Sequence, residues 1–426
     1  MILDQIYRID QSIWKKDLLI VFLLVTFSFP KAGAIILGAP ITLSTILYGI
    51  VLLAFTPYIF RYIKRHIFIT CYYTVYLILI CLNTTVHVGN LPLKNYLFPL
   101  VVAFSPLAYL IGKNIRYECC MKLLSVSGII VGLYSIAQWL FGITQTTIPG
   151  ITLALGDSWE NKPIGYGFTT LHEATKMPST AQNGNNIAIL CVLAIGTLLT
   201  WFPNTRKWFY AKWCSLGLFF TALILSGARS SVYPFFCLLP LGVYGCWKQY
   251  HKREKKEWIA IILTLAVTIL FILILMQIPQ LTPLVNQETA IDYIDGTSRL
   301  TEDIGTASGR FNIWNGMIQT LKDEYSFLDW TRLIFIGASG ENMMMGGEGL
   351  PLFISMFGAL SAVLFMGMFI PILMLFKQTP TFIWATLSFA GALAVDSGYN
   401  YPPILIWFFV LAGVMMANYK EKDNIK

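Results

Sequence analysis

The stretch Trp213–Trp247, WCSLGLFFTALILSGARSSVYPFFCLLPLGVYGCW, contains one charged residue, Arg229, in 35 positions. Apolar stretches of this kind recur along the chain. Each is about 17 to 25 residues long, which is the length that crosses the hydrocarbon core of a bilayer. The 426 residues are 56% hydrophobic and 12% charged, whereas a soluble protein carries about 25% charged residues. The sequence therefore predicts a protein that crosses a membrane many times.

The apolar stretches predict an all-α, polytopic integral membrane protein with about twelve transmembrane helices. We expect a single membrane domain over residues 1–426, without an internal repeat, and a large outer loop that contains short helices. The expected spans are 18–34, 40–60, 67–84, 96–112, 123–142, 186–202, 214–228, 231–247, 258–278, 350–376, 381–397 and 403–418.

The connectors between these spans differ in charge on the two sides of the membrane. If the N-terminus is cytoplasmic, the cytoplasmic segments contain 21 of the 30 Lys and Arg residues, and the outer segments contain 9. An excess of Lys and Arg marks the cytoplasmic side of membrane proteins, so we expect both termini in the cytoplasm. The first span begins too far from Met1, and lacks the small-residue cleavage pattern, to be a removable signal peptide.

The other charged and reactive residues exclude several classes of function. Of the 22 acidic residues, 8 lie in the cytoplasmic segments and 14 in the outer ones, so the net charge of +8 reflects topology. No nucleic-acid partner is therefore expected. The eight cysteines fall in spans or cytoplasmic connectors and predict no disulfide framework. No metal-ligand spacing and no nucleotide motif is present, so we expect neither a metal nor a cofactor.

Two outer connectors are long, namely 143–185 and 279–349. Long connectors in compact domains are usually functional segments or small folded elements. Within the second, SGRFNIWNGMIQTLKDE (308–324) places apolar residues at helical spacing after a plausible cap, Ser308. This pattern predicts an amphipathic helix that lies on the membrane surface or packs over the bundle.

Arg229 lies at the outer end of the seventh expected span, and Arg229 with Ser230 forms the expected turn to the eighth. An arginine at membrane depth costs several kcal/mol unless it is paired or opens to a polar cavity. Two interpretations stay open. The side chain reaches the lipid headgroups, or its guanidinium binds an anionic group bidentately.

Other outer residues are also open to two interpretations. Arg310, at the start of the expected loop helix, is either a solvated surface residue or a second anion ligand. Glu348 directly precedes the tenth span between glycines, whose flexibility would let a carboxylate enter the mouth of a cavity. His172 and the adjacent Glu173 could handle a proton, although a lone outer histidine is more often structural.

The order of three elements is similar to that of a known family. LSGARSS (225–231) ends a span, GRFNIW (309–314) lies in the large outer loop, and IFIGASGENMMMGGEGLPLFISMFGAL (334–360) leads into the tenth span. In this order and topology the chain resembles the bacterial O-antigen polymerase and O-antigen ligase superfamily. The match covers roughly 220–365, and the N-terminal half agrees mainly in its number of spans.

The motifs of this family fall on particular residues of the chain. Arg229 matches the arginine of a Ser-Arg element that ends a span, with Ala228 in place of the usual serine. Arg310 and Trp314 match a Gly-Arg-x-x-x-Trp element of the large loop. The resemblance therefore places one arginine at a span end and a second in the loop that follows.

The acid-or-histidine position of the family falls on Glu348, ten residues before Gly358. Ligases of this superfamily generally have a histidine there. This chain has no histidine between His251 and its C-terminus. The resemblance therefore favours polymerase over ligase.

The resemblance implies a metal-independent glycosyltransferase at the outer, periplasmic face of the bacterial inner membrane. It would move a glycan from undecaprenyl pyrophosphate to a sugar hydroxyl of another lipid-linked glycan. Arg229 and Arg310 would bind the pyrophosphate and stabilise its departing charge, and Glu348 would orient or deprotonate the acceptor hydroxyl. Expected partners are the two lipid-linked glycans, membrane lipids and a chain-length regulator. The candidate substrate-binding residues are Trp314, Arg299, Arg332 and His172.

Three other functions stay open on the sequence alone. An O-antigen ligase would use lipid A-core as its acceptor. A flippase or secondary transporter would need ionisable residues near the bilayer midplane, for which Asp396, near the end of the eleventh span, is the best candidate. A structural partner of an envelope assembly would leave the outer arginines unexplained.

Overall fold

A computed structural model describes residues 13–36, 39–86, 93–157, 177–251, 255–277, 310–338, 348–396 and 398–423. Of the described residues, 82% lie in helices, which confirms the expected all-α membrane protein in its coarse form. In the described part of the chain, seven helices are long and apolar enough to cross a membrane, namely Leu43–Arg65, Ile67–Val86, Tyr117–Phe141, Arg206–Leu225, Lys256–Leu275, Ala359–Lys377 and Pro402–Tyr419. The number of twelve spans stays a prediction.

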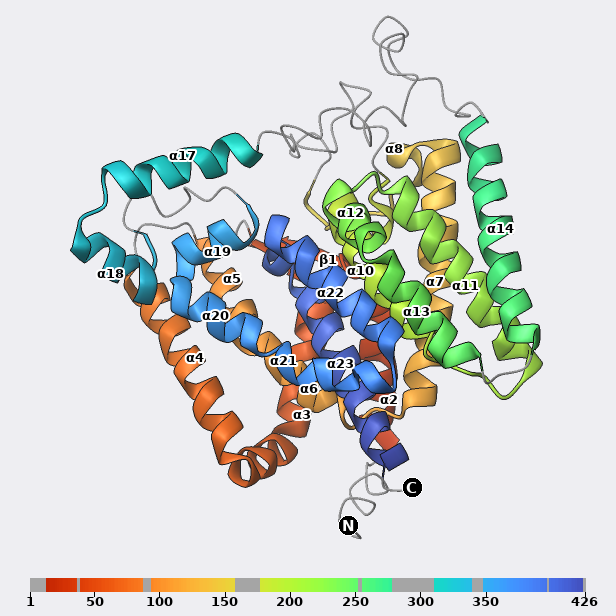
Figure 1. The fold of residues 1–426 in the computed structure, drawn as a ribbon, viewed down its shortest axis with the longest axis horizontal. Helices are drawn as coiled ribbons and strands as arrows, with labels where there is room; N and C mark the ends of the chain where they lie inside the picture. The colour runs from red at the N-terminus through yellow and green to blue at the C-terminus, as the bar shows by residue number, and fades with distance from the viewer. Residues whose placement is uncertain are drawn as a thin grey trace, which may run out of the picture.

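Each expected span falls mainly on one helix or on a run of helices, although 18–34 and 40–60 also reach into two short strands (Figure 1). The first elements are α2 (Ile13–Ser28), β1 (Gly33–Ile36), β2 (Ala39–Thr42), α3 (Leu43–Arg65), α4 (Ile67–Val86), α5 (Leu93–Phe104), η1 (Ser105–Leu107), α6 (Ala108–Gly112), α7 (Tyr117–Phe141) and α8 (Ile143–Thr146). Next come η2 (Ser179–Ala181), α10 (Gly184–Leu198), α11 (Arg206–Leu225), α12 (Arg229–Cys237), α13 (Leu239–Tyr250) and α14 (Lys255–Gln277). The last are α17 (Arg310–Asp323), α18 (Phe327–Phe335), α19 (Gly349–Phe357), α20 (Ala359–Gly367), α21 (Ile370–Leu373), η6 (Met374–Lys377), α22 (Pro380–Val395), η7 (Gly398–Asn400) and α23 (Pro402–Asp423).

Two expected spans are divided at a proline. The expected span 96–112 forms α5 and then η1, and Pro106 lies near the start of η1. The expected span 231–247 forms α12 and then α13, and Pro240 lies near the start of α13. Proline has no N–H and clashes with the preceding turn, so it is tolerated where a helix begins. Hydropathy alone did not reveal these breaks, because the apolar run continues through each proline.

A third expected span, 350–376, is divided at Gly358, where φ is 84°. A Cβ at this position would lie 2.8 Å from the Ile334 carbonyl oxygen of α18, so the close passage of α18 requires a glycine. Near the break, the Ser355 carbonyl oxygen of α19 accepts a hydrogen bond from the Ala338 N–H at 2.7 Å. The interruption therefore separates α19 from α20 and joins α19 to the chain that follows α18.

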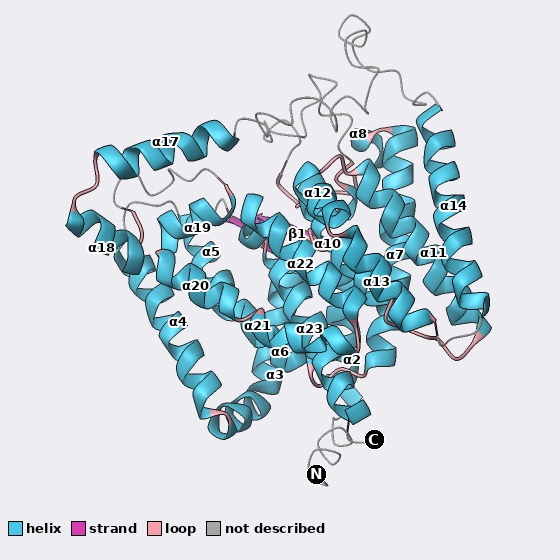
Figure 2. Ribbon diagram, viewed as in Figure 1, coloured by secondary structure: helices cyan, strands magenta, loops and turns pink. Residues whose placement is uncertain are grey.

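A small antiparallel sheet departs from the expected all-helical chain (Figure 2). β1 and β2 pair with Gly33 opposite Thr42. The segment 149–157 after α8, here called the strap, lies along β1: the Leu155 N–H donates to the Gly33 carbonyl oxygen, and the Ile35 N–H donates to the Leu155 carbonyl oxygen, both at 2.8 Å. The sequence did not show these strands, because four apolar residues at the end of a span look like its continuation.

The core of the bundle is built around α23. In the candidate span of α23, 83% of the residues are buried, against 17% in that of α14. Gly112 of α6 and Gly413 of α23 allow the backbones of the two helices to touch. A Cβ on Gly112 would lie 2.2 Å from the Val410 carbonyl oxygen. A Cβ on Gly413 would lie 2.2 Å from the Tyr109 carbonyl oxygen. Small residues permit this close approach of helices in membranes.

Replacing Gly413 with Ala should destabilise the fold, because the new Cβ forces α23 away from α6. Overpacking of this kind costs about 1–3 kcal/mol, and we expect a lower thermal unfolding midpoint of the protein in detergent. The matched control is Gly49→Ala in α3, where a new Cβ meets nothing within 4 Å. Its midpoint should stay or rise, since alanine favours a helix. Equal midpoints for Gly413→Ala and the wild type would contradict the backbone contact.

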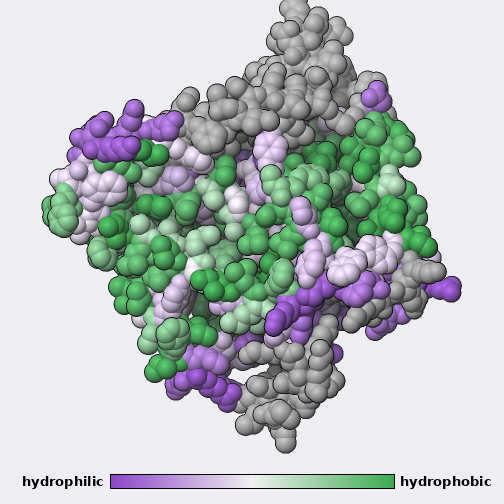
Figure 3. Space-filling view, viewed as in Figure 1, coloured by the Kyte–Doolittle hydropathy of each residue, from purple (hydrophilic) through white to green (hydrophobic). Residues whose placement is uncertain are grey.

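The two ends of the bundle differ. α2 begins and α23 ends at one end, here called the terminal end, whereas α7 ends and α10 and α12 begin at the opposite one, here called the distal end (Figure 1). Figure 3 shows hydrophilic residues at both ends and a belt of apolar residues between them. This pattern is what a bilayer requires of a protein that spans it.

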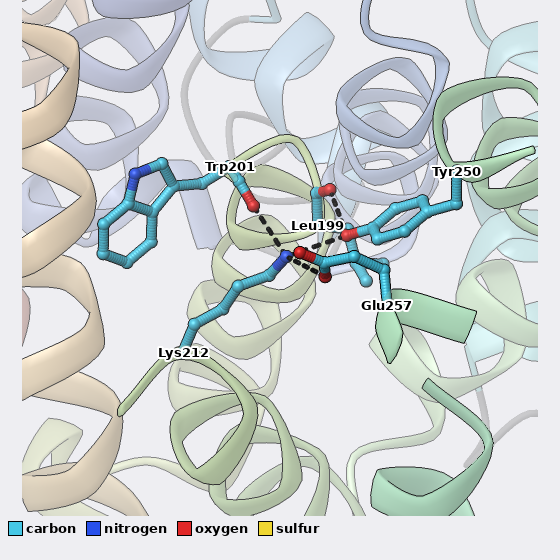
Figure 4. A network of polar contacts seen from close by, with 5 residues as sticks. All are labelled: Leu199, Trp201, Lys212, Tyr250 and Glu257. Carbon is cyan, nitrogen blue, oxygen red and sulfur yellow. Dashed lines mark hydrogen bonds and ion pairs between the residues drawn. The ribbon is translucent and has the colours of Figure 1, made fainter. Parts of the chain in front are cut away.

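A buried lysine ties four elements together at the terminal end (Figure 4). The Lys212 Nζ donates to the Trp201 carbonyl oxygen at 2.6 Å and to Tyr250 Oη at 2.9 Å. It also lies 4.0 Å from Glu257 Oε2, and Tyr250 Oη donates to the Leu199 carbonyl oxygen at 2.7 Å. These contacts join the chain after α10 to α11, α13 and α14.

Replacing Lys212 with Met should destabilise the protein, because it leaves the Glu257 carboxylate buried without its cation. Loss of one partner of a buried ion pair typically costs about 3–5 kcal/mol. We expect the double variant Lys212→Met/Glu257→Gln to regain part of this loss in thermal unfolding midpoint. Lys207→Met, at an exposed lysine of the same helix, is the control. Strictly additive effects of the two buried substitutions would argue against the pair.

Candidate functional site

Several helix ends meet at the distal end. α10, α12 and α19 begin there, and each packs against α22, which ends there at Val395. The first turn of a helix presents N–H groups without partners in the helix and carries a partial positive charge. A convergence of helix N-termini therefore favours an anionic group.

Asp396, the residue after α22, connects these helices. This residue is 7% exposed. Its Oδ2 accepts a hydrogen bond from Asn185 Nδ2 of α10 at 2.6 Å and another from Ser230 Oγ of α12 at 3.2 Å. We call Asn185, Ser230 and Asp396 the Asp396 cluster; Arg229 directly precedes Ser230 on α12. The carboxylate of Asp396 is thus buried between α10 and α12, at the end of α22.

Arg229 is the first residue of α12 and is half-buried. The sequence placed Arg229 and Ser230 in the turn between two spans, but the turn consists of Ser226–Ala228, with Gly227 at φ 59°. Ser226 Oγ closes this turn by accepting from the Ala228 N–H at 3.3 Å. The left-handed glycine thus completes the reversal early, and Arg229 becomes the first residue of α12, next to Ser230, which binds Asp396.

Glu348 precedes α19 and is half-buried. The next residue, Gly349, has φ 68°, and a Cβ on it would lie 2.3 Å from the Ala394 carbonyl oxygen of α22. Tyr399 Oη also donates to the Gly349 carbonyl oxygen at 2.6 Å. Gly349 therefore permits close packing against the last turn of α22, two residues before Asp396, rather than free movement of Glu348.

The segment before α10 is polar, uncharged and buried. The Ser179 N–H donates to Gln138 Oε1 of α7 at 2.7 Å, and Gln182 Nε2 donates to Asp157 Oδ2 of the strap at 2.8 Å. Ser179 and Gln182, at φ 47° and 55°, are the positive-φ residues other than glycine in the described part of the chain. Strained backbone of this kind is often found at functional sites. The sequence placed this segment in an outer loop, although its uncharged polar run next to an apolar helix was a signal.

The remaining predicted residues are not gathered around Asp396 in the described residues. Arg310 begins α17, and its side chain lies outside the described part. α17 runs along the distal end toward α18 and away from α12 (Figure 1). Trp314 of α17 and Arg332 of α18 are half-buried. Arg299 and His172 lie outside the described residues.

The groups at this end could bind a charged group. The Asp396 cluster supplies a carboxylate, an amide and a hydroxyl, Arg229 supplies a guanidinium at the start of α12, and three helices begin here. Among the described residues, no three His, Cys, Asp or Glu side chains are grouped so that they could hold a metal ion. The structure thus places the start of α12, with Arg229, and the start of α19, after Glu348, against α22. It adds Asn185 and Ser230, which the sequence did not single out as a site, and joins them to Asp396, which the sequence named only as a candidate residue of a transporter.

Comparison with known proteins gives no relative. The chain matches no protein-family model, no curated protein and no solved structure. The likeness to the O-antigen polymerase and ligase superfamily rests on its motifs and their order alone.

Replacing Asp396 with Ala should destabilise the distal end, because Asn185 and Ser230 lose their shared acceptor. Each buried polar group left without a partner costs about 1–3 kcal/mol, so the thermal unfolding midpoint should fall clearly. The thermal unfolding midpoint of Asp396→Asn should fall less, because the amide oxygen of asparagine can still accept a hydrogen bond. The control is Asp17→Ala at an exposed carboxylate of α2. A midpoint for Asp396→Ala equal to that of this control would show that the cluster does not hold the helices.

Proposed function

We propose that the chain is a glycosyltransferase that polymerises lipid-linked oligosaccharide repeat units at the outer face of the bacterial inner membrane. The observation that carries the proposal is the placement of Arg229 at the start of α12 and of Glu348 just before α19, two helices that pack against α22. The Ser230–Asp396 hydrogen bond fixes the first helix, and the contact of Gly349 with Ala394 fixes the second. These are the arginine and acid positions of the superfamily that the motifs resemble.

In this proposal Arg229 binds the pyrophosphate of the undecaprenyl-linked donor. A guanidinium holds two phosphate oxygens at once, and the N–H groups at the starts of α10 and α12 add favourable partial charge. As the bond between the anomeric carbon and the phosphate oxygen breaks, negative charge grows on the departing undecaprenyl pyrophosphate. Fixed positive groups away from bulk water stabilise that charge most strongly.

Glu348 acts on the acceptor. A hydroxyl oxygen of a second lipid-linked glycan forms the new bond to the anomeric carbon, and the carboxylate of Glu348 takes its proton. Gly349 supports this role because its contact with α22 fixes the residue next to the base. Arg310 and Trp314, on α17, would complete the binding of the donor from the loop side.

The charge distribution supports an orientation with both termini in the cytoplasm. Basic residues at the end of α3 and the start of α11, among them Lys64, Arg65, Arg206 and Lys207, lie at the terminal end. An excess of basic residues favours the cytoplasmic side. The Asp396 cluster, at the opposite end, would then face the periplasm, where lipid-linked glycans are polymerised in the superfamily.

The proposal is tested by deleting the gene in its source strain and separating the surface glycolipids on a gel. If the chain is a polymerase, the ladder of glycolipid bands on the gel should collapse to a core that carries one repeat unit. Loss of every repeat, with accumulation of lipid-linked polymer, would instead identify a ligase. An unchanged ladder would contradict both.

Restoring the gene with Arg229→Lys should recover little polymer. Lysine keeps the positive charge but cannot form the bidentate hydrogen bonds of a guanidinium. A charge-assisted hydrogen bond of about 1.5–3 kcal/mol corresponds to a roughly 10- to 100-fold lower rate. Arg310→Lys should also lower the rate, and Glu348→Gln should lower it by about 100-fold or more if the carboxylate is the base. Arg206→Lys and Glu324→Gln, at exposed residues, are the controls. A full ladder with Arg229→Lys would contradict the proposed role of the arginine.

A further inference from the structure

Lys248, in the last turn of α13, is a half-buried cation at the terminal end that the proposed mechanism does not use. Its Nζ lies 5.7 Å from the centre of the Tyr244 ring and 5.6 Å from the centre of the Phe376 ring. Among the described residues, Lys248 Nζ forms neither an ion pair nor a hydrogen bond. Aromatic faces attract an ammonium, but its three N–H donors stay able to bind an anion.

The rings beside Lys248 belong to an exposed aromatic cluster that joins α13 to η6. Tyr244 stacks with Phe376 of η6 at 6.0 Å between ring centres, and it contacts Trp247 at 6.3 Å. Trp247 in turn stacks on His251 at 5.0 Å. All four rings are exposed. Tyrosine and tryptophan are enriched where a membrane meets water, so the cluster marks that level on the bundle.

Hydrogen bonds of Gln249 hold the end of α13 against the chain between η6 and α22. Thr381 Oγ1 of α22 donates to Gln249 Oε1 at 2.9 Å, and Gln249 Nε2 donates to the Gln378 carbonyl oxygen at 3.5 Å. Lys377, which directly follows Phe376, is exposed. The contact between α13 and η6 therefore brings the backbone of a second lysine close to Lys248.

Both elements change in character toward the terminal end. Val243 of α13, Ile370 of α21 and Met374 of η6 are apolar and exposed, at 60%, 64% and 68%. Along each element the aromatic residues follow these apolar ones, and a lysine follows the aromatic residues. The apolar belt gives way to hydrophilic residues in the same direction (Figure 3). This is the order of chemical groups along a phospholipid, from acyl chain to headgroup.

We propose that Tyr244, Trp247, Lys248, Phe376 and Lys377, here called the lysine–aromatic patch, bind an anionic phospholipid of the leaflet at the terminal end. The phosphate binds the two ammonium groups, the glycerol region lies against the rings, and the acyl chains follow the exposed apolar side chains of the same elements. In the orientation proposed above, this is the cytoplasmic leaflet. The lipid site does not depend on the proposed function.

The charge of this region favours an anionic lipid over a zwitterionic one. The connector 248–257 contains five Lys and Arg residues and two Glu residues, so its own carboxylates do not neutralise it. Clusters of lysine and arginine beside a membrane span attract anionic headgroups. Phosphatidylcholine has the same phosphodiester as phosphatidylglycerol, but its choline cation is repelled by the two lysines.

The test titrates phosphatidylglycerol and phosphatidylcholine separately into the full chain in detergent and follows lipid binding by native mass spectrometry. The wild type should bind phosphatidylglycerol at least tenfold more tightly. Lys248→Gln should weaken this binding about fivefold, and Lys248→Gln/Lys377→Gln about 25-fold, since each lysine near a headgroup contributes a similar attraction. Lys248→Arg should bind as tightly as the wild type, because arginine keeps the charge and also stacks on rings.

Lys16→Gln is the matched control. It removes the same charge from an exposed lysine of the terminal end, on α2, which packs against α3 and α7. Its affinity for phosphatidylglycerol should stay within twofold of the wild type. Equal losses in Lys16→Gln and Lys248→Gln would overturn the site in favour of a diffuse attraction to the whole end. Equal affinities of the wild type for the two lipids would also overturn it.

A second measurement uses the wild type alone, so a variant that fails to fold does not block the test. The protein in nanodiscs of phosphatidylglycerol or of phosphatidylcholine is acetylated with a lysine-reactive ester, and the extent at each lysine is read by peptide mass spectrometry. Phosphatidylglycerol should slow the reaction at Lys248 and Lys377 several-fold more than at Lys16. The same slowing at all three lysines would overturn the site. Polymer synthesis plays no part in either measurement, so the lipid site and the proposed function can fail separately.

Discussion

The hydrogen bonds to a single carboxylate oxygen hold the distal end together. Oδ2 of Asp396 accepts from Asn185 on α10 and from Ser230 on α12 where α22 ends. A buried carboxylate is stable only where charge-assisted hydrogen bonds replace its hydration. Because Ser230 follows Arg229 directly, the bond that stabilises the carboxylate also fixes the first turn of the helix that presents the arginine. The proposed chemistry thus depends on a residue that needs no contact with the substrate.

The helix α10 links the two polar networks of the molecule. At its first turn Asn185 binds the carboxylate of Asp396, and after its last turn the Trp201 carbonyl oxygen accepts from the ammonium of Lys212. A negative charge at the N-terminus and a positive charge at the C-terminus both complement the dipole of a helix. α10 is buried along nearly all of its length, where such interactions are little screened by water. Its position is therefore set at both ends by charge and between them by packing.

The sequence predicted the positions of the helices well, because apolar length is a direct consequence of bilayer thickness. It did not predict the breaks at Pro240 and Gly358, since hydropathy is insensitive to backbone conformation. Motif order singled out Arg229 and Glu348, and their roles stay predictions. Asn185 and Asp396 could not be paired from the sequence, because they are 211 positions apart and only the packing of α10 on α22 brings them together.

The interruption at Gly358 has a consequence for how the protein responds to its lipids. α19 is a rod of nine residues, about 13 Å long at 1.5 Å per residue. One end is pinned by the Ala338–Ser355 hydrogen bond, and the other by the contact of Gly349 with Ala394. A continuous span tilts or shifts when the hydrocarbon thickness changes. A short helix that is fixed at both ends instead keeps its position relative to the neighbouring helices. The depth of Glu348 is thereby uncoupled from bilayer thickness, so membranes of different composition would present the carboxylate at the same height above the bundle.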